Sequence, residues 1–198
     1  MPADQPTRVL IAEDEAIIRL DLKELLEEEG FEVVGETGRG DEAVELVRAL
    51  QPDLAILDIK MPGLDGLSAA RQITADRLAA VLILTAFSQR DLVEQARDAG
   101  AMSYIVKPFQ KSDLVPAIEL AVGRYAELQS LEREVDDLAE RLEARKAIDR
   151  AKGVLMDKYG LTEQAAWRFL QTQAMNRRVK VHEVAALVVD GAFGPEAS

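Results

Sequence analysis

Residues 56–66 read Ile-Leu-Asp-Ile-Lys-Met-Pro-Gly-Leu-Asp-Gly, and this stretch decides the fold of the first half of the chain. Asp58 follows an apolar run and precedes a Pro-Gly turn, so we expect it where a buried strand ends and a loop begins. A carboxylate in that place should be exposed and positioned to react.

Other polar side chains follow apolar runs in the same way. They are Glu13 and Asp14 after residues 9–12, Thr85 after 81–84, and Lys107 after 104–106. Helical patterns alternate with these runs, which is typical of a parallel sheet with right-handed crossovers. We therefore predict a doubly wound, five-stranded parallel sheet with helices on both faces. Such sheets bind ligands beyond the carboxyl ends of their strands.

The predicted crevice combines three acids, one hydroxyl and one amine. Clustered carboxylates repel one another unless a hard cation neutralises them, and Mg²⁺ prefers oxygen ligands together with retained water. A carboxylate can also accept a phosphoryl group to form an acyl phosphate. The crevice is therefore interpreted as a magnesium site at which a phosphoryl group is transferred.

Residues from about 8 to 123 resemble the receiver domain of two-component response regulators, which has a flavodoxin-like fold. The resemblance is carried by Glu13-Asp14, Asp58, Met61-Pro62, Asp65-Gly66, Thr85-Ala86, Tyr104 and Lys107-Pro108, in the order and spacing of that family. Taken singly, each of these residues has an ordinary reading as a surface, capping or core residue. The joint pattern favours the phosphoacceptor interpretation.

The resemblance implies a role for each matching residue. Asp58 would be the phosphoacceptor, and Glu13, Asp14, Asp58 and the Lys60 carbonyl would hold Mg²⁺. Lys107 and Thr85 would contact the phosphoryl oxygens, and Tyr104 would be the switch aromatic that turns inward when Thr85 moves. The Lys107-Pro108 bond is often cis in the family.

Composition limits the class of protein. The chain has 198 residues, of which 48% are hydrophobic, and no cysteine. No apolar stretch approaches the roughly 18 residues of a membrane span, and the N-terminus lacks a secretory signal. We expect a cytoplasmic protein of one to two domains.

Charge is distributed unevenly along the chain. The formal net charge is −12, yet residues 141–180 contain ten basic and four acidic residues, a net of +6. Local positive charge of this kind attracts a phosphate backbone.

A helical region is predicted after Ser112, which is a plausible N-cap. Apolar residues then recur at heptad spacing, at Leu128, Leu131, Val135, Leu138 and Leu142. This stripe predicts either the seam of a homodimeric coiled coil or a face that packs on the C-terminal part of its own chain. Three further helical patterns form a small all-α module, with Thr162 as an N-cap and a turn at residues 176–178.

Residues from about 128 to 192 resemble an ANTAR domain, the RNA-binding output of transcription antitermination regulators. The carrying residues are Ile148, Ala151-Lys152-Gly153, Leu155-Met156, Ala165, Trp167, Leu170, Ala174 and Glu183-Val184-Ala185. The resemblance implies binding to paired RNA hairpins in nascent transcripts.

Within this module, basic residues are the candidate RNA contacts: Lys146, Arg150, Lys152, Arg168, Arg177 and Arg178. Leu155, Met156 and Trp167 are expected in the core, although Trp167 has base stacking as its alternative. Gly153 is expected to permit close helix packing.

The sequence thus predicts a receiver at 8–123, a helical linker at 124–143 and an ANTAR-like domain at 144–192. The predicted function is phosphorylation-controlled RNA binding in antitermination, with Mg²⁺, a sensor histidine kinase, and a homodimer on phosphorylation. The chain has no predicted catalytic output domain. A DNA-binding regulator and a protein-docking adaptor are the alternatives.

Overall fold

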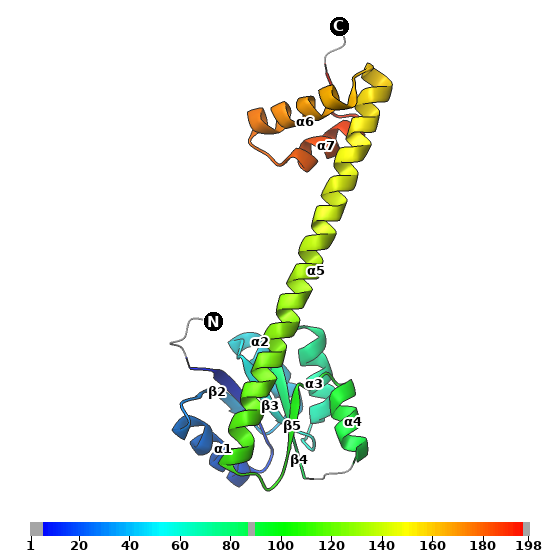
Figure 1. The fold of residues 1–198 in the computed structure, drawn as a ribbon. Coiled ribbons are helices and arrows are strands. Elements are labelled where there is room, and N and C mark those ends of the chain that lie inside the picture. Colours follow the sequence, from blue (N-terminus) through cyan, green and yellow to red (C-terminus); the bar gives the residue numbers. More distant parts are fainter. Residues whose placement is uncertain (1–5, 87–89, 196–198) are drawn as a thin grey trace. The chain divides into compact units, whose positions relative to one another are not determined.

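The computed structural model describes residues 6–86 and 90–195, and the chain forms two compact units, Met1–Gln129 and Ser130–Ser198 (Figure 1). Each unit has its own core. Within these described residues, no helix has an apolar stretch long enough to cross a membrane.

The first unit contains a five-stranded sheet. Its strands are β1 (Arg8–Ala12), β2 (Glu32–Thr37), β3 (Leu54–Asp58), β4 (Ala80–Thr85) and β5 (Ser103–Val106), in the order β2-β1-β3-β4-β5. All neighbouring strands are parallel. β3 and β4 are buried along their full length, as expected for central strands covered on both faces. The predicted doubly wound parallel sheet is therefore confirmed.

Helices cover both faces of this sheet (Figure 1). They are α1 (Ala16–Glu28), α2 (Gly40–Leu50), α3 (Gly66–Ala75), α4 (Arg90–Asp98) and the first part of α5 (Lys111–Tyr159). One apolar core joins the sheet to α2, α3 and α4, and the other joins it to α1 and α5. Leu22 and Leu26 of α1, for example, are fully buried beside Leu114 and Ile118 of α5. The helix packing holds the carboxyl ends of the strands at one edge.

The helix α5 continues without a break for 49 residues, with Pro116 inside it. The expected N-cap at Ser112 was wrong, because the helix already begins at Lys111. The carboxylate of Asp113 instead accepts a hydrogen bond from the Gln110 backbone N–H at 3.0 Å. A carboxylate in the first turn is also favoured by the helix dipole.

The second unit is all-helical. It consists of the later part of α5, α6 (Glu163–Arg177) and α7 (Val181–Val189). Its buried core comprises Ala151, Leu155, Ala166, Leu170, Ala174, Val184, Ala185 and Val188. Thr162 caps α6 as predicted, because its hydroxyl accepts a bond from the Ala165 N–H at 3.2 Å. The small all-α module is thus confirmed.

Three expectations for this module were wrong. Met156 and Trp167 are exposed rather than core, with exposed fractions of 41% and 38%, whereas Leu155 is buried as expected. A Cβ added to Gly153 would meet no atom within 4 Å, so close helix packing in the described residues does not explain this glycine.

Candidate functional site

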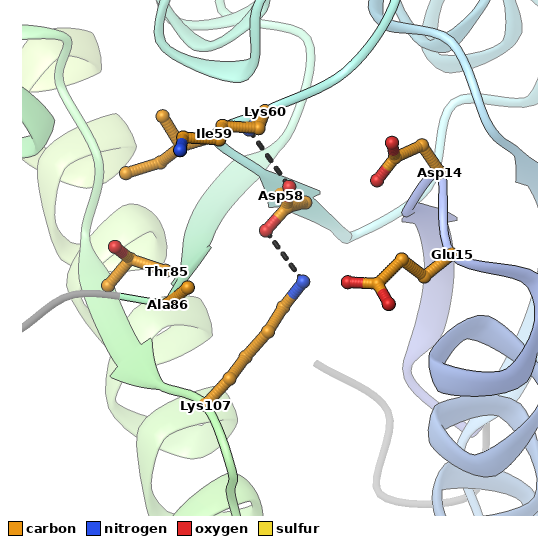
Figure 2. Close-up of a pocket in the computed structure, with 8 residues that line it drawn as sticks. All are labelled: Asp14, Glu15, Asp58, Ile59, Lys60, Thr85, Ala86 and Lys107. Carbon is orange, nitrogen blue, oxygen red and sulfur yellow. Dashed lines mark hydrogen bonds and ion pairs between the residues drawn. The ribbon is translucent and has the colours of Figure 1, made fainter.

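A pocket lies at the carboxyl edge of the sheet (Figure 2). It is lined by Asp14, Glu15, Asp58, Ile59, Lys60, Thr85, Ala86 and Lys107. These residues end or follow four different strands, and the parallel topology brings the four strand ends together. The structure therefore places Asp14, Asp58, Thr85 and Lys107 together as the sequence predicted, and the Glu13 carboxylate contacts the Lys107 amine from beside the pocket.

Lys107 lies at the centre of the charged groups. Its amine is 2.7 Å from Oδ1 of Asp58 and 2.5 Å from Oε2 of Glu13. Figure 2 shows the Lys107 side chain extending toward Asp58 from the opposite wall of the pocket. The Lys107-Pro108 peptide bond is cis. One cation thus bridges two carboxylates that would otherwise repel each other.

The acids differ in their exposure to water. Asp14 is exposed, but Asp58 is only 5% exposed and Glu13 is fully buried. The expectation that Asp58 would be exposed was therefore wrong. Asp58 ends β3 inside the pocket, and its Oδ2 accepts a hydrogen bond from the Lys60 N–H at 2.9 Å.

Burial and pairing have opposite effects on two titratable groups. Burial raises the pKa of Glu13, and the hydrogen bond from Lys107 only partly offsets this effect. Burial alone would lower the pKa of Lys107, but hydrogen bonds to Asp58 and Glu13 outweigh it and raise that pKa. Pairing with two carboxylates thus favours the protonated form of the Lys107 amine, whereas burial disfavours the charged form of Glu13.

The carboxylates of Glu13, Asp14 and Asp58 fit a hard divalent cation. One oxygen from each can be chosen so that all three lie within 4.8 Å of one another. An all-oxygen donor set with an exposed side matches Mg²⁺, which keeps part of its water shell. Lys60, whose carbonyl was expected to be a further ligand, lines the same pocket.

Two positioning contacts were not foreseen from the sequence. Arg19 of α1 donates a hydrogen bond from Nη1 to the Glu13 carbonyl at 2.5 Å, which fixes the backbone that carries the acidic pair. At Gly40, an added Cβ would lie 1.9 Å from the Leu64 carbonyl oxygen. The glycine thus allows the N-terminus of α2 to touch the loop that follows Asp58.

The predicted switch residues sit on neighbouring strands. Thr85 is 3% exposed and lies at the end of β4, where it pairs with Val106 of β5. Tyr104, two residues earlier on β5, is 45% exposed. The tyrosine side chain therefore faces solvent in this structure rather than lying inward.

The predicted seam is exposed along α5. Its five residues, Leu128, Leu131, Val135, Leu138 and Leu142, have exposed fractions between 43% and 63%. The stripe is therefore not used to pack α5 onto the described residues of its own chain.

The candidate RNA contacts occupy several parts of the second unit. Lys152 lines a shallow groove with Trp167, and its amine is 2.9 Å from carboxylates of Asp149 and Glu163. Lys146 and Arg150 are four residues apart and share a different, exposed face of α5.

The other three candidates lie on α6 and at its end. Arg168 is exposed beside Trp167, and Arg177 stacks over the Phe193 ring at 4.0 Å from its centroid. Arg178 ends the helix in the left-handed conformation, with φ of 57°. The six basic residues therefore lie on α5, on α6 and at the end of α6.

A parallel α/β fold with an acidic pocket at its strand ends is typical of receiver-type signalling domains. Comparison with known proteins identifies the same class of domain. The family model of the response regulator receiver domain matches residues 9–119, and that of the ANTAR domain matches residues 136–189. The chain therefore belongs to the response regulators that carry an ANTAR domain. A receiver joined to an ANTAR domain indicates a regulator without a catalytic output domain.

Individual relatives cover the chain to different extents. The transcriptional regulatory protein PdtaR of Mycobacterium tuberculosis is 59% identical over 185 residues, which is 93% of this chain and 90% of PdtaR. The chemotaxis protein CheY of Thermotoga maritima is 42% identical over 112 residues, covering 56% of this chain and 93% of CheY.

Solved structures match the first unit. The receiver domain of the response regulator NarL from Mycobacterium tuberculosis has a TM-score of 0.58 and 30% identity, covering 60% of this chain and 98% of that one. CheY in a CheX-CheY-BeF3-Mg²⁺ complex from Borrelia burgdorferi is also similar, with a TM-score of 0.55 and 28% identity, and the match covers 58% of this chain and 87% of that one. Receiver domains bind Mg²⁺, and the acidic cluster described above is present here.

Proposed function

We propose that this protein is a phosphorylation-controlled, RNA-binding regulator of transcription antitermination. The observation that carries the proposal is the ion pair between Lys107 and Asp58, in an acidic pocket on a chain that continues into an ANTAR domain. A receiver implies a sensor kinase as phosphoryl donor, and an ANTAR domain implies RNA as the output ligand. Functionally, residues 8–123 receive the signal, 124–143 connect, and 144–192 bind RNA.

The reaction begins at Asp58, with a phosphohistidine of the kinase as donor. A carboxylate oxygen of Asp58 attacks phosphorus, the new O–P bond makes an acyl phosphate, and the P–N bond breaks with its electron pair returning to the imidazole. Asp58 is ready for this step because the Lys60 N–H holds one oxygen at 2.9 Å and Lys107 holds the other at 2.7 Å.

The remaining pocket residues act on the transferred group. The Lys107 amine moves with little displacement from the carboxylate to a phosphoryl oxygen, and the Thr85 hydroxyl contacts a second oxygen. Glu13, Asp14, Asp58 and the Lys60 carbonyl would hold Mg²⁺, which supplies positive charge that offsets the carboxylates and the phosphoryl oxygens. The likeness to a CheY solved with BeF3 and Mg²⁺ supports this assignment.

The switch passes through Thr85 and Tyr104. When Thr85 moves toward the phosphoryl group, it vacates space beside β5, and Tyr104 turns from solvent into that space. The exposed position of Tyr104 supports its assignment as the resting state of this switch. A two-state element of this kind converts a local charge change into a change of surface.

The surface that changes with Tyr104 favours formation of a homodimer. The two copies would contact each other through the exposed seam of α5. The exposed leucine and valine stripe at heptad spacing supports a second copy of this chain as the partner. Two ANTAR domains would then be held together to engage two adjacent RNA hairpins. The net charge of +6 in residues 141–180 supports a polyanionic ligand.

The first test compares wild-type protein with Asp58→Asn after incubation with a small acyl-phosphate donor and Mg²⁺. Wild type should gain a phosphoryl group that alkali and hydroxylamine remove, as expected for an acyl phosphate, and bind a synthetic RNA of two adjacent stem-loops more tightly. The variant should gain neither. Label on the variant would overturn Asp58 as acceptor, and stronger binding to duplex DNA than to the stem-loops would favour a DNA-binding regulator.

A further inference from the structure

The only tryptophan of the chain is exposed in a groove on the second unit. The groove lies between α5 and α6 and is lined by Arg141, Ala144, Arg145, Ile148, Asp149, Lys152 and Trp167. All of these residues belong to the same compact unit. We call this set of residues the Trp167 groove.

Trp167 does not contribute to the core as its neighbours on α6 do. Ala166 and Leu170 are fully buried and Ala174 is 4% exposed, so the core stripe of α6 runs through these three positions. Trp167 stands beside that stripe and leaves 38% of its surface in water. An indole exposed in a groove offers a flat apolar face to a ligand.

The groove combines this aromatic face with positive charge. Arg141 and Arg145 are exposed, four residues apart on α5, and lie on the same side as the groove. Asp149 is the acidic residue of the lining, and its carboxylate is 2.9 Å from the Lys152 amine. Arg145 also interacts electrostatically with Asp149, so the lining has three cations, Arg141, Arg145 and Lys152, against this one carboxylate, and Ile148 adds apolar surface.

These features match one class of ligand. A nucleic-acid base has a flat face for stacking, and its phosphate is an anion that an arginine can bind in bidentate fashion. Bases in RNA loops are unstacked and accessible, whereas those in a duplex are not. A protein partner would match the apolar surface but has no general reason to bring phosphate-like charge.

We infer that the Trp167 groove is a stacking site for an unpaired RNA base, with the adjacent phosphate held by Arg141 and Arg145. The inference rests on the proposed RNA-binding function and adds to it the place where a loop base is recognised. It also predicts that recognition needs an unpaired loop, because a paired base cannot enter the groove.

Trp167 itself reports on the site, because no other tryptophan contributes to the fluorescence. Full-length protein, unmodified and phosphorylated with an acyl-phosphate donor and Mg²⁺, is titrated with the two-stem-loop RNA. A second RNA of the same length is fully paired. Stacking should quench the indole emission with the stem-loop RNA and leave it unchanged with the duplex.

Variants separate stacking from general packing. Trp167→Ala should weaken stem-loop binding about tenfold, as expected for one lost base stack, while Trp167→Phe should keep most of the affinity. The matched control is Met175→Ala, which removes another exposed apolar side chain of α6 that does not line the groove. This variant should bind the stem-loop RNA as tightly as wild type does. Circular dichroism and thermal unfolding verify that each variant is folded.

The outcomes distinguish a failure of RNA binding from a failure of the groove assignment. If wild type binds neither RNA in either state, the proposed function fails and the groove is open to a protein partner. If wild type binds the stem-loops with unchanged emission and Trp167→Ala binds equally well, RNA binding stands and the groove assignment is overturned. Quenching together with selective loss in Trp167→Ala and recovery in Trp167→Phe supports the stacking site.

Discussion

The Lys107 amine lies 2.7 Å from Oδ1 of Asp58 in a pocket where both side chains are largely buried. The same amine is 2.5 Å from the buried Glu13 carboxylate, so a single cation balances two acids. The pocket is therefore pre-organised, since a phosphoryl group on Asp58 would meet a protonated amine already in place. Removing that amine should affect both stability and chemistry.

Lys107→Met should lower the free energy of unfolding by about 2 kcal/mol at pH 7 without divalent cations, because it leaves two buried carboxylates without their cation. Mg²⁺ should restore part of this loss by taking over the neutralising role. Urea unfolding with and without Mg²⁺ measures both effects. Equal unfolding midpoints for wild type and variant in the absence of Mg²⁺ would refute the balancing role of Lys107.

The buried Glu13 carboxylate makes stability depend on pH. The pKa of Glu13 is raised in the folded state. Its contribution to the free energy of unfolding is therefore fully present below the ordinary pKa of 4.5, and it is lost as the pH rises through the pKa of the folded state. Glutamine does not ionise, so the Glu13→Gln variant does not lose this contribution. In the absence of Mg²⁺, the stability of the variant relative to wild type should therefore increase from pH 4.5 to neutral pH. Urea unfolding at a series of pH values provides the comparison.

The control for this experiment is Glu15→Gln, which changes an exposed acid beside the same pocket and should show no such trend. Glu13→Gln should also bind Mg²⁺ more weakly, because an amide replaces a carboxylate ligand. A flat difference between Glu13→Gln and wild type across this pH range would show that burial of Glu13 carries no cost.

The strand ends could be predicted from sequence because apolar runs mark buried strands and parallel topology brings their carboxyl ends together. The burial of Asp58 could not be predicted from the sequence, because it depends on Lys107 and Glu13, which follow other strands. Trp167 was misplaced for a related reason. It is adjacent to Ala166 and three residues before Leu170, and helical periodicity alone does not say on which side of the stripe the core ends.

Gly40→Ala should reduce stability and Mg²⁺ binding together. An added Cβ would lie 1.9 Å from the Leu64 carbonyl oxygen, and the backbone loop that follows Asp58 would have to move. The expected loss of unfolding free energy is about 2 kcal/mol or more, as for other overpacked sites. Urea unfolding measures the stability, and isothermal titration calorimetry measures the affinity for Mg²⁺.

Gly38→Ala, two residues before Gly40, is the matched control, since its Cβ would meet atoms no closer than 3.4 Å. That variant should keep its Mg²⁺ affinity. If Gly40→Ala and Gly38→Ala behave alike, the contact between α2 and the loop after Asp58 has no role in placing the acidic pocket.

The seam predicts a specific effect on assembly. The double variant Leu131→Glu, Leu138→Glu should leave the monomer as stable as wild type, because both side chains are more than half exposed. Dimerisation of the phosphorylated protein should be lost, since charges replace the apolar seam. Sedimentation velocity measures the oligomeric state, and Val189→Glu, on another exposed position, is the control. A phosphorylated dimer that survives the double change would exclude the seam as its interface.

Gly153 gives a prediction in which stability and binding change in opposite directions. An added Cβ at Gly153 or at Gly123 would meet no atom of the described residues within 4 Å. Both glycines lie inside α5, so Gly→Ala should raise stability by about 1 kcal/mol at each position. Gly153, however, follows Lys146 and Arg150 at spacings of seven and three residues and shares their face. If the RNA backbone approaches this face closely, a methyl group there obstructs it.

We therefore expect Gly153→Ala to unfold at higher temperature and to bind the two-stem-loop RNA more weakly, while Gly123→Ala gains stability with unchanged affinity. Thermal unfolding and RNA titration on the same preparations decide the matter. Unchanged RNA affinity in both variants would mean that no ligand approaches Gly153, and would remove the Lys146 and Arg150 face from the proposed RNA surface. Weaker binding by Gly153→Ala alone would place the RNA backbone against that face, because no atom in the part of the chain that the structure describes lies within 4 Å of the added Cβ.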